Sequence, residues 1–177
     1  MRRILHVLIE GDSDEDFVDI VIKPCLIVKN KYDEVIPFKY ANTGKDIVES
    51  YVSTVKGKGE DIICLTDLTH APCVSGRIEQ LINHEIETFD AAKIFVVVKE
   101  IEGWYLAGFD SSGCKRIHIS YERRTDGIRK GSFNQLISKS KYRPRVACMY
   151  EMLKHFDLQL ASERNKSFYR IFDRFLK

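Results

Sequence analysis

The 177-residue sequence contains no apolar run near the roughly 18 to 20 residues that a membrane-spanning helix needs. It also lacks a recognisable secretion signal. The basic and apolar start of residues 1–9 is short, has no small-residue cleavage site and is followed at once by acidic residues. A cytoplasmic protein with no membrane contact is therefore expected. Because 44% of its residues are hydrophobic and 31% are charged, a single globular domain over residues 1–177 is predicted.

Cysteine motifs and nucleotide-binding loops are also missing. The five cysteines are odd in number and none is spaced Cys-x-x-Cys, which indicates reduced core thiols. His70 and Cys73 lie three residues apart, but no second ligand pair follows, so zinc is not expected. Residues 43–45, "TGK", are not a P-loop, because no glycine lies five residues upstream and Asp46 replaces Ser or Thr. No dinucleotide-binding glycine motif and no nucleophile elbow occur either.

Charge is unevenly distributed along the chain, although the net charge is only +2. Residues 1–110 hold 12 Lys+Arg and 20 Asp+Glu, a net charge of −8, whereas residues 111–177 hold 16 and 6, a net charge of +10. An acidic half suits cations and a basic half suits a polyanion such as nucleic acid. The alternative is that two oppositely charged surfaces complement each other across the fold.

Apolar runs alternate with amphipathic segments. Strands are predicted at residues 3–9, 35–40, 61–67 and 93–99, and helices at residues 13–28, 46–57, 75–89 and 100–109. This alternation predicts an α/β fold with a mostly parallel sheet flanked by helices. The basic part, residues 111–177, is predicted to be mainly helical, with "RIHIS" at 116–120 as a possible further strand.

Single residues refine these boundaries. Pro37 places its strand at an edge of the sheet, since proline cannot donate to a ladder. Ser13 and Asp16 have the spacing of a capping box at the start of the first helix, and Pro24 should kink or end that helix.

Acidic side chains follow the ends of three predicted strands. Glu10 follows the first strand, Asp67 ends the strand at 61–67, and Glu100 and Glu102 follow the strand at 93–99. In open α/β sheets, ligands bind beyond the carboxyl ends of the strands. Crowded carboxylates repel one another, and a hard cation such as Mg²⁺ or Mn²⁺ removes that repulsion. A metal bridged to a phosphate would polarise the phosphate and orient a water.

Simpler roles remain open for each of these acids. The acidic residues 12–16 are typical of a solvated helix start, and Asp67 could cap the next helix. Glu100 and Glu102 lie two apart and do not share a helix face, so only one of them, with Glu100 preferred, is expected to face the site. Arg77 could neutralise the site or bind a phosphate.

The basic half offers residues 121–133, "YERRTDGIRKGSF", and residues 138–150, "SKSKYRPRVACMY". Basic and hydroxyl side chains suit phosphate contacts, and exposed aromatic rings can stack on unpaired bases. Candidate phosphate contacts are Arg123, Arg124, Arg129 and Lys130, and candidate stacking residues are Tyr121, Phe133 and Tyr142. The alternative is a solvated cationic surface without a ligand.

Four segments together resemble a known family: "IEGDSDEDFV", "LTDLTHAPCVSGRIEQL", "VVKEIEGWYLAG" and "ERNKSFYRIF". They are similar to a TOPRIM-like family of prokaryotic proteins of unknown function, related to the TOPRIM domain of OLD-type nucleases. The resemblance runs from about residue 4 to 175 and implies a Rossmann-like, TOPRIM-type fold with a metal site. Glu10 would match the TOPRIM glutamate and Asp67 the first aspartate of an Asp-x-Asp pair. Thr69 stands where the second aspartate belongs.

The expected function is a Mg²⁺- or Mn²⁺-dependent nuclease, a phosphodiesterase acting on DNA or RNA. Glu10, Asp67 and Glu100 would be catalytic, Glu102 would join them around the metal, and Arg77 would accompany the basic residues at the nucleic acid. A catalytically degenerate nucleic-acid-binding module is the alternative, which Thr69 favours. A third possibility is a partner-binding module of a larger complex, for example with an ATPase. The sequence leaves the oligomeric state open.

Overall fold

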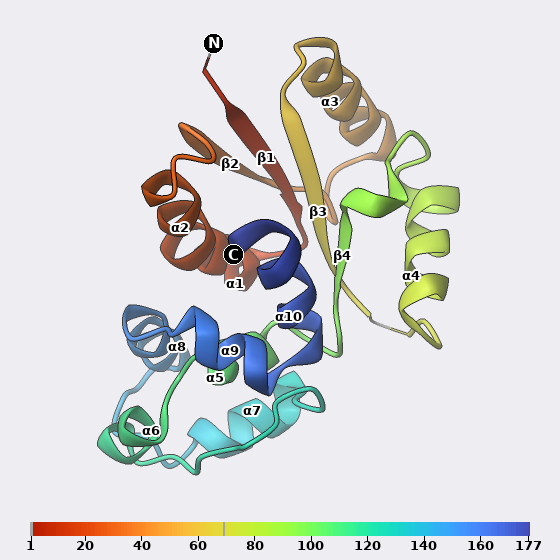
Figure 1. The fold of residues 1–177 in the computed structure, drawn as a ribbon. Helices are drawn as coiled ribbons and strands as arrows, with labels where there is room; N and C mark the ends of the chain where they lie inside the picture. The colour runs from red at the N-terminus through yellow and green to blue at the C-terminus, as the bar shows by residue number, and fades with distance from the viewer. Residues whose placement is uncertain (1, 69) are drawn as a thin grey trace. The chain divides into compact units, whose positions relative to one another are not determined.

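The computed structural model describes residues 2–68 and 70–177 and divides into two compact units, Met1–Val96 and Val97–Lys177, called unit 1 and unit 2 (Figure 1). Unit 1 holds 11 Lys+Arg and 17 Asp+Glu, a net charge of −6, and unit 2 holds 17 and 9, a net charge of +8. The charge asymmetry of the sequence is therefore also an asymmetry between the units. A single domain over residues 1–177 stays a prediction.

Unit 1 alternates strands and helices, as the apolar pattern predicts. Its strands are β1 (Ile4–Ile9), β2 (Glu34–Lys39), β3 (Asp61–Asp67) and β4 (Ile94–Val97), which ends at the unit boundary. Its helices are α1 (Asp12–Phe17), a π-helical segment (Val18–Ile22), α2 (Lys23–Val28), α3 (Lys45–Gly57), α4 (Val74–Gln80), a second π-helical segment (Leu81–Glu85) and a 3₁₀ turn (Ala91–Lys93).

The four strands of the described residues form one parallel sheet in the order β2-β1-β3-β4. Figure 1 shows α1 and α2 on one side of this sheet and α3 and α4 on the other, as right-handed crossovers require. The predicted α/β, Rossmann-like architecture is confirmed, and β2, which contains Pro37, lies at an edge.

β1 is buried because it is a central strand covered by helices on both faces. Its apolar residues from Leu5 to Ile9 are fully inaccessible to solvent. His6 is the polar exception, and it is satisfied inside the unit. Its Nδ1 lies 2.6 Å from the hydroxyl of Tyr51, and its Nε2 lies 2.8 Å from a carboxylate oxygen of Glu60.

The first helix differs in detail from its prediction. It begins at Asp12, and the Asp14 carboxylate accepts a hydrogen bond of 2.9 Å from the backbone N–H of Gly11, so the predicted Ser13–Asp16 capping box is wrong. The helix starts earlier than predicted because the chain turns directly at Gly11, two residues before Ser13. Pro24 does not end the helix, because it lies in the first turn of α2, just after a π-helical segment.

Unit 2 is mainly helical, as predicted. Its helices are α5 (Glu102–Ala107), α6 (Ser111–Ile117), α7 (Lys130–Ile137), α8 (Arg145–Lys154), α9 (Leu158–Arg164), α10 (Lys166–Ile171) and a final π-helical segment (Phe172–Leu176). α5 is buried along its whole length and contacts α7, α8 and α9. No helix of the described residues is long and apolar enough to cross a membrane.

The possible strand at residues 116–120 is wrong. The carboxylate of Asp110 accepts a hydrogen bond of 2.6 Å from the backbone N–H of Gly113 and starts α6, which then runs to Ile117. His118 adopts a left-handed conformation, with φ of 64°, and ends the helix. A local cap therefore overrides the alternating apolar pattern of this short segment.

Candidate active site at the ends of β1 and β3

The strand order reverses at β1, since β2 lies on one side of it and β3 on the other. Parallel sheets bind ligands at such a switch point, outside the carboxyl ends of the two central strands. Glu10 directly follows β1, and Asp67 is the last residue of β3. The structure brings these two predicted site residues together at this point.

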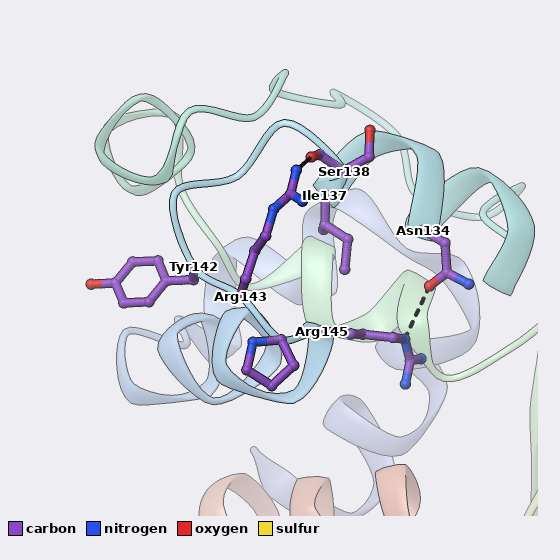
Figure 2. A pocket seen from close by; sticks show the side chains of 7 residues that line it. Asn134, Ile137, Ser138, Tyr142, Arg143 and Arg145 are labelled. Carbon is purple, nitrogen blue, oxygen red and sulfur yellow. Dashed lines mark hydrogen bonds between the residues drawn. The ribbon is translucent and has the colours of Figure 1, made fainter.

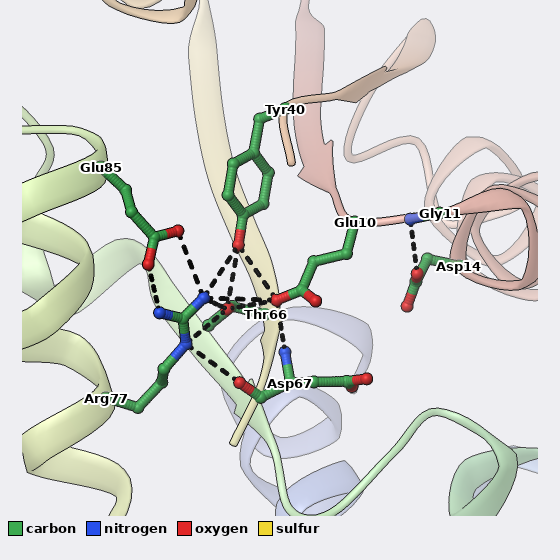
Figure 3. Close-up of polar contacts among 8 residues, drawn as sticks. All are labelled: Glu10, Gly11, Asp14, Tyr40, Thr66, Asp67, Arg77 and Glu85. Carbon is green, nitrogen blue, oxygen red and sulfur yellow. Dashed lines mark hydrogen bonds and ion pairs between the residues drawn. The ribbon is translucent and has the colours of Figure 1, made fainter. Parts of the chain in front are cut away.

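One carboxylate oxygen of Glu10, Oε1, is surrounded by donors (Figure 3). The hydroxyl of Thr66 donates to it at 2.7 Å, the backbone N–H of Asp67 at 2.9 Å and the hydroxyl of Tyr40 at 3.1 Å. The Nη2 of Arg77 lies 3.4 Å away. These contacts from β3, α4 and the end of β2 fix the orientation of a side chain that is 26% exposed.

Arg77 is buried behind Glu10, with 8% of its surface exposed. Its Nε donates to the hydroxyl of Thr66 and to the backbone carbonyl of Asp67, both at 3.0 Å, and its Nη1 donates to Glu85. Burial opposes the charge of Arg77, but its contacts with Glu85 and the nearby Tyr40 raise its pKa above the ordinary arginine value. Arg77 is therefore a permanent cation inside the acidic site.

This placement separates the two roles that the sequence left open for Arg77. All three of its nitrogens are engaged with groups of unit 1, so the structure favours neutralisation of the site. A phosphate contact by Arg77 stays a prediction.

Two groups near Glu10, the Tyr40 hydroxyl and the Cys64 thiol, are held in their neutral forms. Burial, with Cys64 and Glu10 nearby, raises the pKa of Tyr40 above its usual range, so that its hydroxyl remains a donor. Burial likewise raises the pKa of the Cys64 thiol, which is completely inaccessible to solvent. Cys64, like Cys114 and Cys148, is thus a free core thiol, as the cysteine pattern predicts, whereas the prediction is wrong for Cys73, which is exposed.

The second oxygen of Glu10 and the carboxylate of Asp67 lie on the side of the network away from Arg77 (Figure 3). Two carboxylates suit Mg²⁺ or Mn²⁺, because such ions keep several waters and share their remaining positions with substrate phosphate. These residues do not build a closed cage. No group of three or more His, Cys, Asp or Glu side chains gathers for a metal within residues 2–68 and 70–177. The donor set therefore fits a metal held jointly with a ligand.

The acidic residues that follow Glu10 serve the start of α1. Lys39, at the end of β2, forms ion pairs with Asp12 at 2.7 Å and with Glu15 at 2.6 Å. Asp14 caps Gly11, as described above. The simpler interpretation of this acidic turn, a charged helix start, accounts for these three residues.

Glu100 and Glu102 belong to unit 2 and are engaged there. Glu100 accepts a hydrogen bond from the backbone N–H of Lys130, and Glu102, which is 4% exposed, forms an ion pair with Arg145. Their role in a metal shell stays a prediction. The four predicted basic contacts of unit 2 are exposed, at Arg123, Arg124, Arg129 and Lys130.

Sequence reasoning missed three members of the Glu10 network: Tyr40, Thr66 and Glu85. Two of them carry a signal that is visible in the sequence. Thr66 interrupts an apolar strand directly before Asp67, and Glu85 lies eight residues, about two helical turns, after Arg77. Tyr40 has no such signal, because only the pairing of β1 with β2 brings it to Glu10.

The aromatic residues proposed to stack on bases are only partly available. Phe133 is fully buried, so its proposed stacking role is wrong, because its ring packs inside unit 2. The ring of Tyr121 is covered on one face by the guanidinium of Arg164, 4.3 Å from the ring centre. Tyr142 is partly exposed.

Two of the segments that carry the sequence resemblance, residues 97–108 and 163–172, lie in unit 2 and contact each other. The indole N–H of Trp104 donates to the hydroxyl of Ser167 at 2.8 Å, and Arg164 donates to backbone carbonyls at the end of α5. A Cβ on Gly103 would lie only 2.9 Å from the carbonyl oxygen of Thr125, so glycine is needed there. Trp104 and Tyr105 are fully buried core residues. Gly103, Trp104 and Tyr105 of this distinctive pattern are therefore structural.

No protein-family model and no curated protein matches the chain. Among solved structures, the C-terminal region of the Burkholderia pseudomallei OLD protein aligns over 100% of both chains, with a TM-score of 0.50 and 12% identity. The chain shares the fold of this OLD region. The C-terminal region of the Xanthomonas campestris pv. campestris OLD protein covers 99% of this chain and 86% of its own, with a TM-score of 0.36 and 15% identity. The similarity to the Burkholderia pseudomallei OLD region confirms the Rossmann-like, TOPRIM-type fold that the sequence predicts.

Proposed function

We propose that this chain is a TOPRIM-like phosphodiesterase that acts on nucleic acid with the help of Mg²⁺ or Mn²⁺. The proposal rests on one observation: Glu10 and Asp67 lie together at the switch point of the sheet. Donors hold one oxygen of the Glu10 carboxylate, and its other oxygen points away from Arg77. The fold shared with the OLD C-terminal region supports this proposal, and so does the positive charge of unit 2.

The second oxygen of Glu10 and the carboxylate of Asp67 would hold the cation. When bound, the cation would polarise a phosphate and help to orient a water for in-line attack. Thr66, Tyr40 and the backbone N–H of Asp67 hold Glu10 in one orientation, which a preorganised site requires. Exposed arginines and lysines of unit 2 would bind the phosphate backbone of the substrate.

A catalytically degenerate nucleic-acid-binding module is the second candidate. It is favoured by Thr69, which takes the place of an expected aspartate and lies outside the described residues. The guanidinium of Arg77, 3.4 Å from Glu10, also lowers the attraction of the site for a cation. An ATPase as protein partner stays a prediction.

Manganese titration and plasmid nicking separate the two candidates. Asp67→Asn and Glu10→Gln keep the side-chain shapes and remove one charge each, so each should weaken Mn²⁺ binding and lower nicking by roughly 100-fold or more. Thr69→Asp adds a charged ligand and should tighten Mn²⁺ binding. The control is Glu87→Gln, since Glu87 is exposed and pairs with Lys45, which is not a member of the Glu10 network.

Activity that persists in Asp67→Asn and Glu10→Gln would overturn the proposed active site. Nucleic-acid binding without nicking in any variant, including Thr69→Asp, would favour the degenerate module.

A further inference from the structure

Unit 2 contains a pocket of about 410 Å³ between the end of α7, residues 138–144 and the start of α8 (Figure 2). Such a volume lies in the range of pockets that bind small organic ligands. Ile137 points into the pocket and Pro144 forms another part of its apolar lining, whereas the ring of Tyr142 points away from the other labelled side chains. The site therefore offers apolar surface to a ligand.

The polar part of the lining includes two arginines, Arg143 and Arg145, and no acid. Residues 134–145, which contain the lining, hold four Lys+Arg and no Asp or Glu. A ligand at this pocket therefore meets a net positive charge, which favours an anion.

The two arginines of the pocket differ in how many of their hydrogen-bond donors already have partners within the unit. Arg145 is committed within the unit, since it pairs with the buried Glu102 and its Nε donates to Asn134 at 3.0 Å. Arg143 is exposed and donates through Nη2 to the backbone carbonyl of Ser138 at 2.8 Å. No acidic partner of Arg143 occurs in the described part of the chain. Arg143 is thus anchored at one nitrogen and retains other donors for a ligand.

We infer that this pocket binds one unpaired nucleotide of single-stranded DNA or RNA. The base lies against Ile137 and Pro144, and the phosphate on Arg143. Inorganic phosphate would leave the apolar surface unused, and a purely apolar ligand would leave the uncompensated charge unused. A duplex does not fit this description, because its bases are stacked and paired and cannot enter a pocket.

The choice of a strand over a free nucleotide rests on the proposed function. It is supported by Arg129 and Lys130, which lie at the other end of α7, about 10 Å away along the helix axis. A strand with one nucleotide in the pocket can reach these two cationic residues with its neighbouring phosphates. Free mononucleotides share the chemistry of the site, so the experiment must test them separately.

The test is fluorescence anisotropy of a labelled 12-nucleotide oligothymidylate at one fixed low salt concentration. Arg143→Gln removes the free cation. Ser138→Phe fills the rim of the pocket without changing charge, and it retains the backbone carbonyl that anchors Arg143. Each variant should bind the strand roughly tenfold more weakly, which is the scale of one lost stacking or phosphate contact. The control, Arg170→Gln, removes an exposed arginine of α10 and should change the affinity less than twofold.

Competition identifies the ligand. Thymidine 5′-monophosphate should displace the strand from the wild type at lower concentration than inorganic phosphate does, and it should lose this advantage in Ser138→Phe. Unchanged strand binding in Ser138→Phe and Arg143→Gln would overturn the pocket while leaving nucleic-acid binding, and hence the proposed function, intact. Binding of the mononucleotide without any binding of the strand would make the pocket a mononucleotide site and overturn its assignment to a strand. Circular dichroism of each variant checks its fold.

Discussion

Among the residues that the structure describes, two arginines are buried, one in each unit, and their surroundings are opposite. In unit 1, Arg77 meets carboxylates: Glu85 pairs with it, and Glu10 lies 3.4 Å away. In unit 2, Arg164 meets backbone carbonyls and the face of Tyr121. Burial lowers the pKa of Arg164 from its ordinary value, whereas the acidic neighbours of Arg77 raise its pKa.

The comparison shows that burial of a charge does not by itself indicate a functional site. Arg164 donates to the carbonyls of Leu106, Ala107 and Phe109 at 2.8 Å each, so it satisfies the unpaired end of α5 and fixes the fold. Arg77 lies beside the carboxylates of Glu85 and Glu10, and Glu10 directly follows the carboxyl end of β1. Arg164 therefore has a structural role, whereas Arg77 lies at the proposed site.

The largest effect is expected from Arg164→Leu. Removing this guanidinium leaves several buried carbonyls without donors, so unit 2 should lose roughly 3 to 5 kcal/mol of unfolding free energy. Urea unfolding can be followed by the fluorescence of Trp104, the single tryptophan, which lies in unit 2. Arg164→Lys keeps the charge but not the planar fork and should recover only part of the loss. An unchanged urea midpoint in Arg164→Leu would mean that Arg164 does not hold α5.

Arg77→Gln should have a smaller effect on stability and an additional effect on ligand binding. We expect a loss of about 2 to 3 kcal/mol, because buried partners lose a charged donor. Mn²⁺ binding, measured calorimetrically, should tighten several-fold, because a positive charge beside Glu10 has been removed. Glu85→Gln should shift Mn²⁺ affinity in the opposite direction, since it leaves the charge of Arg77 less compensated. Weaker Mn²⁺ binding in Arg77→Gln would contradict a neutralising role for Arg77.

The smallest effect is expected from Tyr40→Phe. Loss of one buried hydroxyl donor should lower stability by about 1 kcal/mol at pH 8. The folded protein raises the pKa of Tyr40, so the unfolded chain releases this proton first, near pH 10. The stabilisation of the neutral hydroxyl is therefore complete below about pH 10 and is lost as the pH rises further.

Urea midpoints at pH 8 and pH 10.5 measure this difference. The alkaline loss should be smaller in Tyr40→Phe than in the wild type, and the same loss as the wild type is expected in the control Tyr169→Phe, where the tyrosine is half exposed. Equal alkaline losses in all three proteins would show that the buried surroundings of Tyr40 do not raise its pKa.

Much of the fold could be predicted because its signals are local. The apolar runs of β1 and β3 stand out from the charged segments between them, and Pro37 marks β2 as an edge strand. The segment at 116–120 could not be assigned correctly, because its outcome depended on the cap that Asp110 gives to α6. A five-residue alternating pattern is thus weaker evidence for a strand than a capped N-terminus is for a helix.

The sequence by itself determined which residues stand at the strand ends, Glu10 and Asp67, because strand length and chain order fix them. It also determined the division of charge between the acidic and basic parts of the chain. Only the tertiary structure decided that Arg77 faces Glu10, that Tyr40 joins them from another strand, and that Glu102 is paired with Arg145. These contacts join residues 30 to 67 positions apart, and such distant side chains meet only through strand pairing and helix packing, which no local pattern encodes.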